Sequence, residues 1–224
     1  MPKTADLPTP ALLLHEPALS QNIQAMQAKA DQLGLHLRPH VKTHKMPALA
    51  QRQWDTGATG LAVATLHEAT MMREAGFTDI QVANEVIQPA AVQQFRNLSE
   101  QGRLRCAVDS IAGLERLNEA FQRSRYPAEV LLDIDTGLRR AGLSSQEDAL
   151  TLAHAIRQYP NVKLTGLMTH GGHSYGSADP ATLQGYAQAE QNQLEATAQA
   201  LQQAGFPLDT VSIGATPLLP YLQP

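Results

Sequence analysis

Short apolar segments alternate with longer amphipathic segments along the whole chain, and this alternation most constrains the fold. Short apolar runs are typical of buried strands, and hydrophobic residues spaced by threes and fours are typical of helices. Strict alternation predicts a parallel sheet covered by helices, and eight units predict closure into a (β/α)8 barrel of the α/β class. The expected strands span residues 11–14, 35–37, 60–64, 80–83, 104–108, 129–135, 162–170 and 209–213.

Seven helices are expected between these strands, several of them opened by a proline or a capping residue. After the last expected strand, three prolines at 217, 220 and 224 leave little room for an eighth helix. The barrel is therefore expected to lack its last helix.

Composition predicts one ordinary globular domain over residues 1–224. The chain is 43% hydrophobic and 17% charged, which suffices for one core. A net charge of -4 indicates no affinity for nucleic acid or for anionic membranes. The single cysteine, Cys106, excludes an intrachain disulfide and is expected to be buried in a strand. No apolar run approaches membrane-spanning length and no signal peptide is recognisable, so we expect a cytoplasmic protein.

A cluster of lysines and histidines, RPHVKTHK at 38–45, follows the second expected strand. A lysine such as Lys42 can form a Schiff base with an aldehyde, and pyridoxal phosphate is the usual aldehyde. The amine must be neutral to react, and Lys45, cationic histidines such as His40 and partial burial would all lower its pKa. The alternative is a solvated basic loop, or one that binds some other phosphate.

Polar residues also follow the later strands. In DTGLRRAG at 135–142, Arg140 could donate to a pyridine nitrogen, or could form a surface ion pair with Asp133 or Asp135. In HGGHSY at 170–175, His170 and His173 could act as acid–base groups or metal ligands. Tyr175 could hydrogen-bond a cofactor, although such residues are often structural. Thr65, His67 and Glu68 either cap a helix or contact a cofactor.

A final motif, SIGATP at 212–217, predicts a phosphate site. Loops after the last barrel strands often bind phosphate. Gly214 and Ala215 would offer backbone N–H groups, and Ser212 and Thr216 would offer hydroxyls. Because each of these groups follows a predicted strand, we expect them at one edge of the sheet, in a single site.

These motifs together resemble the D-threonine aldolase and D-serine dehydratase family of fold-type III pyridoxal-phosphate enzymes, whose barrel is similar to the N-terminal domain of alanine racemase. The resemblance covers nearly the whole chain. It implies pyridoxal 5'-phosphate on Lys42, with Arg140 beside the pyridine nitrogen. It also implies a lyase that acts on β-hydroxy-D-amino acids, with Lys42, His170 or His173 as the base. An aldolase would release glycine and an aldehyde; the alternatives are a dehydratase or a non-catalytic barrel that binds the cofactor.

Two features depart from the family pattern. Family members continue into a C-terminal β domain that holds a divalent metal, manganese or zinc, and closes the active site of a partner subunit. No counterpart of that domain or of its usual metal ligands follows Pro217, although the resemblance still implies a homodimer. Ala215 stands where family members commonly have serine, which removes one side-chain contact to phosphate.

Overall fold

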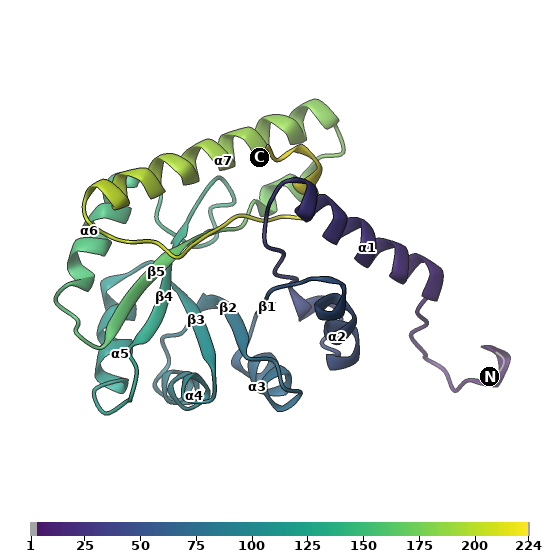
Figure 1. Cartoon of the computed structure of the whole chain (residues 1–224), viewed down its shortest axis with the longest axis horizontal. Coiled ribbons are helices and arrows are strands. Elements are labelled where there is room, and N and C mark those ends of the chain that lie inside the picture. The colour runs from purple at the N-terminus through teal and green to yellow at the C-terminus, as the bar shows by residue number, and fades with distance from the viewer. Residues whose placement is uncertain (1–3, 224) are drawn as a thin grey trace.

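A curled sheet of six parallel strands forms the centre of the computed structural model, which describes residues 4–223. The strands pair in chain order, and seven α-helices lie around them (Figure 1). The strands are β1 (Leu61–Val63), β2 (Asp79–Glu85), β3 (Arg103–Val108), β4 (Ala128–Ile134), β5 (Val162–Thr169) and β6 (Thr210–Ser212). The helices are α1 (Glu16–Gln32), α2 (Pro47–Thr56), α3 (Leu66–Glu74), α4 (Pro89–Ser99), α5 (Ile111–Ala120), α6 (Gln146–Ile156) and α7 (Pro180–Gln203). Short 3₁₀ turns are η1 (Thr4–Asp6), η2 (Val41–Thr43), η3 (Gly172–Gly176) and η4 (Leu219–Tyr221).

Two of the eight expected strands do not form, so the sheet is a half-barrel and the expectation of eight strands was wrong. Residues 11–14 have no strand partner among the described residues and lie apart from the sheet (Figure 1). Leu12 and Leu13 are exposed. Residues 35–37 run beside β1 without joining it as a strand. Ala62 N donates to Pro39 O at 2.8 Å, but Pro39 has no N–H and cannot complete a ladder. The six remaining strands and all seven helices are confirmed.

Side chains at the helix N-termini determine where the loops after the strands end. Thr65, Ser145 and Asp179 each accept a hydrogen bond from a backbone N–H in the first turn of α3, α6 and α7. Ser110, rather than the adjacent Asp109, caps α5. Asp109 is thereby free to accept a hydrogen bond from another loop, as described below.

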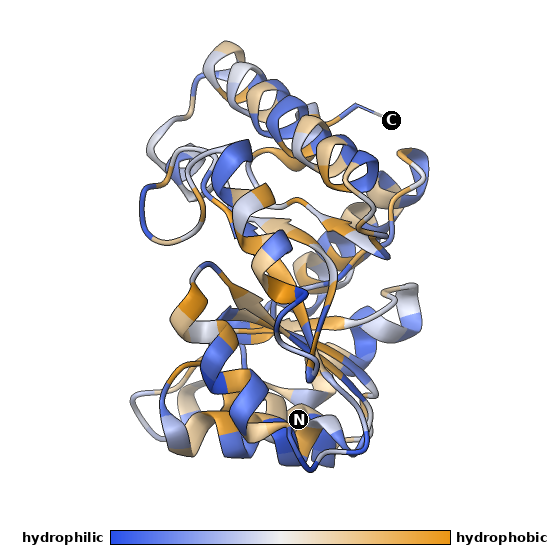
Figure 2. Cartoon of the chain, turned by 90° about the vertical axis from the view of Figure 1, so that its left-hand side faces the viewer, coloured by the Kyte–Doolittle hydropathy of each residue, from blue (hydrophilic) through white to orange (hydrophobic). Residues whose placement is uncertain are grey.

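The two faces of the sheet differ in what covers them. The outer face packs against the helices through a large apolar cluster that includes the fully buried Cys106, as expected. The strands are mainly hydrophobic, whereas the helices carry both kinds of residue (Figure 2). On the inner face, Ala107, Leu131 and Met168 form a separate small cluster at mid-height. Since alternate residues of a strand share a face, polar residues lie above and below this inner cluster.

Below the inner apolar cluster, at the N-terminal ends of the strands, the inner face of the sheet carries a network of ion pairs. Asp79 Oδ1 is 2.8 Å from Arg38 Nη1 and 2.6 Å from Arg105 Nη2. Arg105 also donates to Thr210 Oγ1 at 3.0 Å, and only 1% of its side chain is exposed. The last contact joins β3 to β6, which are not neighbours in the sheet, so it spans the inside of the curve.

We expect Arg105→Met to lower the free energy of unfolding by about 2 to 3 kcal/mol. Breaking a buried pair is costly, but Arg38 still compensates Asp79. The matched control is Arg103→Met, because Arg103 pairs with Glu129 and Asp209 while 38% exposed; its cost should stay below about 1 kcal/mol. Urea unfolding measures both. Equal losses would contradict a special role for the inner network.

Candidate active site

The residues expected to form one site do lie at one edge of the sheet, where the strands have their C-terminal ends. The loop that carries Lys42 joins this edge through a bridge between His40 and Ala62 of β1. Arg140 follows β4, and His170 follows β5 directly. Ser212 is the last residue of β6, and the remaining SIGATP residues continue from it. The parallel sheet therefore brings together motifs that are far apart in sequence.

Lys42 is exposed on the turn η2. Val41 beside it is fully buried and anchors the turn, and His40 Nδ1 accepts a hydrogen bond from Lys42 N at 3.3 Å. The amine of Lys42 has no hydrogen bond or ion pair with any residue that the structure describes. A primary amine held at a fixed place and left without a partner is available to react with an aldehyde.

The histidine beside Lys42 is neutral, which corrects the expectation of cationic histidines. Burial lowers the pKa of His40 to about 4, and the nearby charge of Lys42 adds to this shift. His40 is thus an uncharged imidazole at neutral pH. Its Nδ1 accepts from the backbone, so its proton is on Nε2.

Lys45 has a structural partner. Its ammonium pairs with Glu68, whose side chain is 1% exposed. The other carboxylate oxygen of Glu68 accepts from Ala64 N at 2.8 Å, and Thr65 caps the same helix. Of the two interpretations left open for Thr65 and Glu68, capping is therefore the one observed, and His67 lies exposed.

The loop after β4 directs Arg140, rather than Arg139, towards the other site residues. Asp135 Oδ1 accepts from the backbone N–H groups of Gly137 and Arg139, each at 2.9 Å, which closes a tight turn. Arg139 has a φ of 56° in this turn. Arg140 borders a small crevice, of about 10 Å³, that His170 also lines.

A group of carboxyls lies near Arg140, and of these the sequence pointed only to Asp133, as an alternative ion-pair partner of Arg140. Burial and the adjacent carboxyl of Glu85 raise the pKa of Asp133, while Arg140 acts in the opposite direction. Asp109 Oδ2 accepts from Gly142 N at 3.2 Å and so holds the end of the Arg140 loop. The signal was present in the sequence, because these acids lie at or just after the ends of successive expected strands.

His170 links the loops after β5 and β6. Its Nδ1 is 3.0 Å from Gly214 O. Because a carbonyl only accepts, Nδ1 must carry the proton, which leaves Nε2 with a free lone pair. Burial lowers the pKa of His170, and Lys42 and Arg140 contribute to the shift through their charges. His170 is therefore a neutral base near both cations.

The other two residues of the HGGHSY motif are arranged differently. The ring of His173 packs edge-on against Tyr186 of α7 with centroids 4.6 Å apart, and its Nδ1 is buried without a partner in the described chain. Tyr175 is 61% exposed, and its ring centroid is 6.4 Å from that of His170.

The SIGATP segment presents an open backbone. A Cβ placed on Gly214 would meet no atom within 4 Å, and Thr216 is exposed. Ala215 is buried in an apolar cluster with Leu218. The methyl group of Ala215 thus packs inward, whereas the backbone around it remains accessible to an anion.

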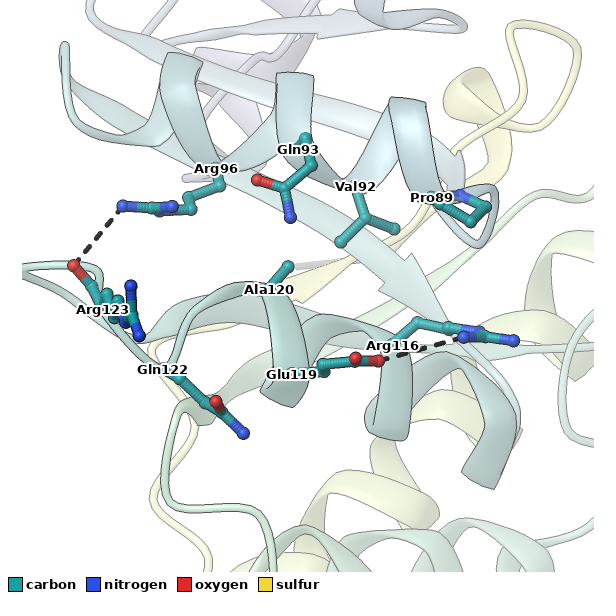
Figure 3. A pocket seen from close by; sticks show the side chains of 9 residues that line it. All are labelled: Pro89, Val92, Gln93, Arg96, Arg116, Glu119, Ala120, Gln122 and Arg123. Carbon is teal, nitrogen blue, oxygen red and sulfur yellow. Dashed lines mark hydrogen bonds and ion pairs between the residues drawn. The ribbon is translucent and has the colours of Figure 1, made fainter.

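A larger groove lies elsewhere. It measures about 430 Å³, lies between α4 and α5, and contains no residue of the expected site (Figure 3). Two of its arginines are already engaged: Arg96 bonds to Arg123 O, and Arg116 pairs with Glu119. Within residues 4–223, no cluster of three or more His, Cys, Asp or Glu is arranged to hold a metal ion. No helix in that range has the length and apolarity needed to cross a bilayer.

Comparisons with known proteins agree with this geometry. The family model of the alanine racemase N-terminal domain matches residues 14–221. The chain is 37% identical to D-threo-3-hydroxyaspartate dehydratase of Delftia sp. (strain HT23), over 94% of this chain and 56% of that protein. It is 32% identical to D-threonine aldolase of Arthrobacter sp, over 95% and 56% of the two chains.

A solved structure shows the same fold. The crystal structure of D-threonine aldolase from Filomicrobium marinum superposes with a TM-score of 0.92 at 31% identity, and covers 97% of this chain and 59% of that one. The chain therefore spans little more than half the length of these relatives. Fold, sequence and the matched family model lead to one conclusion: this chain belongs to the alanine racemase N-terminal domain family.

Proposed function

We propose that this chain is the cofactor-binding part of a pyridoxal-phosphate-dependent lyase that acts on β-hydroxy-D-amino acids, in the manner of a D-threonine aldolase. The observation that carries the proposal is the unpartnered amine of Lys42 at the C-terminal edge of the sheet, close to neutral His40 and His170. The aldolase and dehydratase among its relatives support the same class of reaction.

The residues present fit pyridoxal phosphate. The amine of Lys42 suits its aldehyde, and the permanently charged guanidinium of Arg140 can donate to its pyridine nitrogen. The open backbone at Gly214 and the exposed hydroxyl of Thr216 suit its phosphate, with Ser212 beside them. When bound, the cofactor supplies an electron sink for negative charge at the substrate Cα.

The chain's own residues supply the other functions, which are binding of the cofactor ring and proton transfer. Arg140 holds the ring and limits its electron demand by keeping the nitrogen unprotonated. We assign the general base to His170, because its Nε2 has a free lone pair. For an aldolase, this nitrogen takes the proton of the substrate β-hydroxyl as the Cα–Cβ bond breaks to release an aldehyde, and a proton delivered to Cα then completes glycine and resets the base. His173 and Tyr175 are assigned to the rim of the same site.

A dehydratase is the second candidate, because the relative at 37% identity bears that name. In that case the Cα proton and the β-hydroxyl leave instead. A divalent metal that assists this loss, and a homodimer that completes the site, remain expectations from the family resemblance. We also propose that the half-barrel is an open form of the (β/α)8 barrel. In this open form, residues 35–40 occupy the position of a neighbouring strand beside β1. The edge of β6, which has no further neighbour in the sheet, would accept another strand.

We expect wild-type protein mixed with pyridoxal phosphate to show the absorbance band of a lysine-bound cofactor near roughly 420 nm. Lys42→Arg should abolish the band, because arginine keeps the charge but cannot condense with the aldehyde. Lys163→Arg, at an exposed lysine of β5, is the matched control and should retain it. A band that survives in Lys42→Arg would contradict the assignment.

We expect His170→Asn to lower turnover of D-threonine by about 10²- to 10⁴-fold, as loss of a general base does. Asparagine can still donate to Gly214 O, so the loop should keep its position. Because the pKa of His170 is lowered from its ordinary value of 6.5 and its neutral form is active, protonation of His170 should reduce wild-type turnover only below pH 6.5. His67→Asn is the control.

Parallel assays with D-serine and 3-hydroxyaspartate, with and without added manganese, distinguish aldolase from dehydratase through the products. Cofactor binding without turnover of any of the three would favour a non-catalytic barrel. Turnover that is unchanged in His170→Asn would exclude His170 as the base.

A further inference from the structure

Helix α7 carries a buried carboxyl that has no role in the proposed reaction. Glu190 is 1% exposed, and its Oε1 is buried without a hydrogen-bond partner in the described chain. Its Oε2 is 3.1 Å from Thr136 Oγ1, in the loop after β4. Gly171, in the loop after β5, passes so close that a Cβ there would overlap Oε2. Glu190 thus lies where α7 meets the loops that carry Arg140 and His170.

The number of hydroxyl protons available around Glu190 indicates the protonation state of its carboxyl. Thr169 Oγ1 is 2.7 Å from Ile134 O, and because a carbonyl only accepts, the single hydroxyl proton of Thr169 is used there. Thr136 Oγ1 is 2.9 Å from Thr169 Oγ1, so Thr136 must donate its own proton to Thr169. No proton of Thr136 then remains for Glu190. The 3.1 Å contact is a hydrogen bond only if Glu190 is the donor.

An ionised Glu190 would leave some of these polar atoms unsatisfied. One oxygen–oxygen contact in the chain of hydroxyls would lack a proton, and a buried carboxylate oxygen would face no donor. A neutral carboxylic acid supplies the missing proton and removes the buried charge. The geometry therefore favours the protonated form.

We propose that Glu190 is a positioning residue, protonated in the folded protein, which fastens α7 to the loops after β4 and β5. The importance of those loops for catalysis rests on the proposed function, whereas the fastening itself does not. One turn further along the helix, Gln193 Nε2 donates to Asp135 O at 3.1 Å, so α7 holds the Arg140 loop at two points.

Burial raises the pKa of Glu190 to about 7. No charged neighbour contributes to it. The titratable groups on the elements around Glu190 are Asp135, Arg139, Arg140, Glu147, Asp148, His154, Lys163, His170, His173, Tyr175, Tyr186, Glu195 and Tyr221. The pH response of this contact is therefore assigned to Glu190 itself.

The sign follows from linkage. Between the ordinary pKa of 4.5 and about 7, the folded state holds a proton that the unfolded state has lost. The free energy of unfolding therefore falls as the pH rises through this window, because the unfolding constant rises about tenfold per pH unit. Above the window, the contribution of Glu190 to stability no longer changes with pH. Above pH 7 the folded protein must hold a buried carboxylate, and the fastening weakens.

The first test compares wild type with Glu190→Gln by urea unfolding without cofactor. The amide donates to Thr136 at every pH and never ionises. We expect the ratio of the wild-type to the variant unfolding constant to rise roughly 100-fold between pH 5 and pH 8. Glu195→Gln, at an exposed site on the same helix, should give a flat ratio. A flat ratio for Glu190→Gln would overturn the proposal.

The second test is amide hydrogen exchange in residues 135–142 and 170–176. Protection in wild type should fall from pH 6 to pH 8, protection in Glu190→Gln should persist, and Glu190→Leu should lose it at both pH values. Protection that is unchanged in Glu190→Leu would show that Glu190 fastens nothing. Because neither test involves pyridoxal phosphate, a failure of cofactor binding would count against the proposed function alone.

Discussion

A parallel sheet that curls must fill the inside of its curve as well as cover its outside, and this requirement organises the whole molecule. Because side chains alternate between the faces, every second residue of each strand enters the interior. Here the interior has three levels. Ion pairs around Asp79 and Arg105 lie at the bottom, a small apolar cluster around Leu131 lies in the middle, and the carboxyls and cations of the site lie at the top. The lower two levels hold the third in place.

The site gains its properties from this support rather than from Lys42 alone. Burial makes His40 and His170 neutral, so that the amine of Lys42 stands beside two uncharged imidazoles. The hydrogen bond from His170 to Gly214 O joins the expected base to the expected phosphate loop. The turn that Asp135 closes with the backbone of Gly137 and Arg139 holds the loop that carries Arg140. A small change in any of these loops would therefore move several functional groups together.

Much of this was predictable from the sequence. Periodicity gave six of the strands and all seven helices, and the motifs placed the site residues at one edge. Residues 11–14 were mispredicted because an apolar run cannot show whether a neighbouring strand exists to pair with it. The roles of Glu190 and of the carboxyls near Asp133 were missed because they depend on contacts between distant segments. The order of residue types along the chain also could not show that His40 is buried and neutral, since burial depends on tertiary contacts.

We propose that Lys42, and no other lysine of the chain, holds pyridoxal phosphate. The most direct measurement is borohydride reduction of the protein with bound cofactor, followed by protease digestion and mass spectrometry of the peptides. Reduction makes the lysine–cofactor bond permanent, so the modified residue can be identified. We expect the added mass on Lys42, with Lys45 unmodified because it is paired with Glu68. Modification at Lys45, or at scattered surface lysines alone, would contradict it.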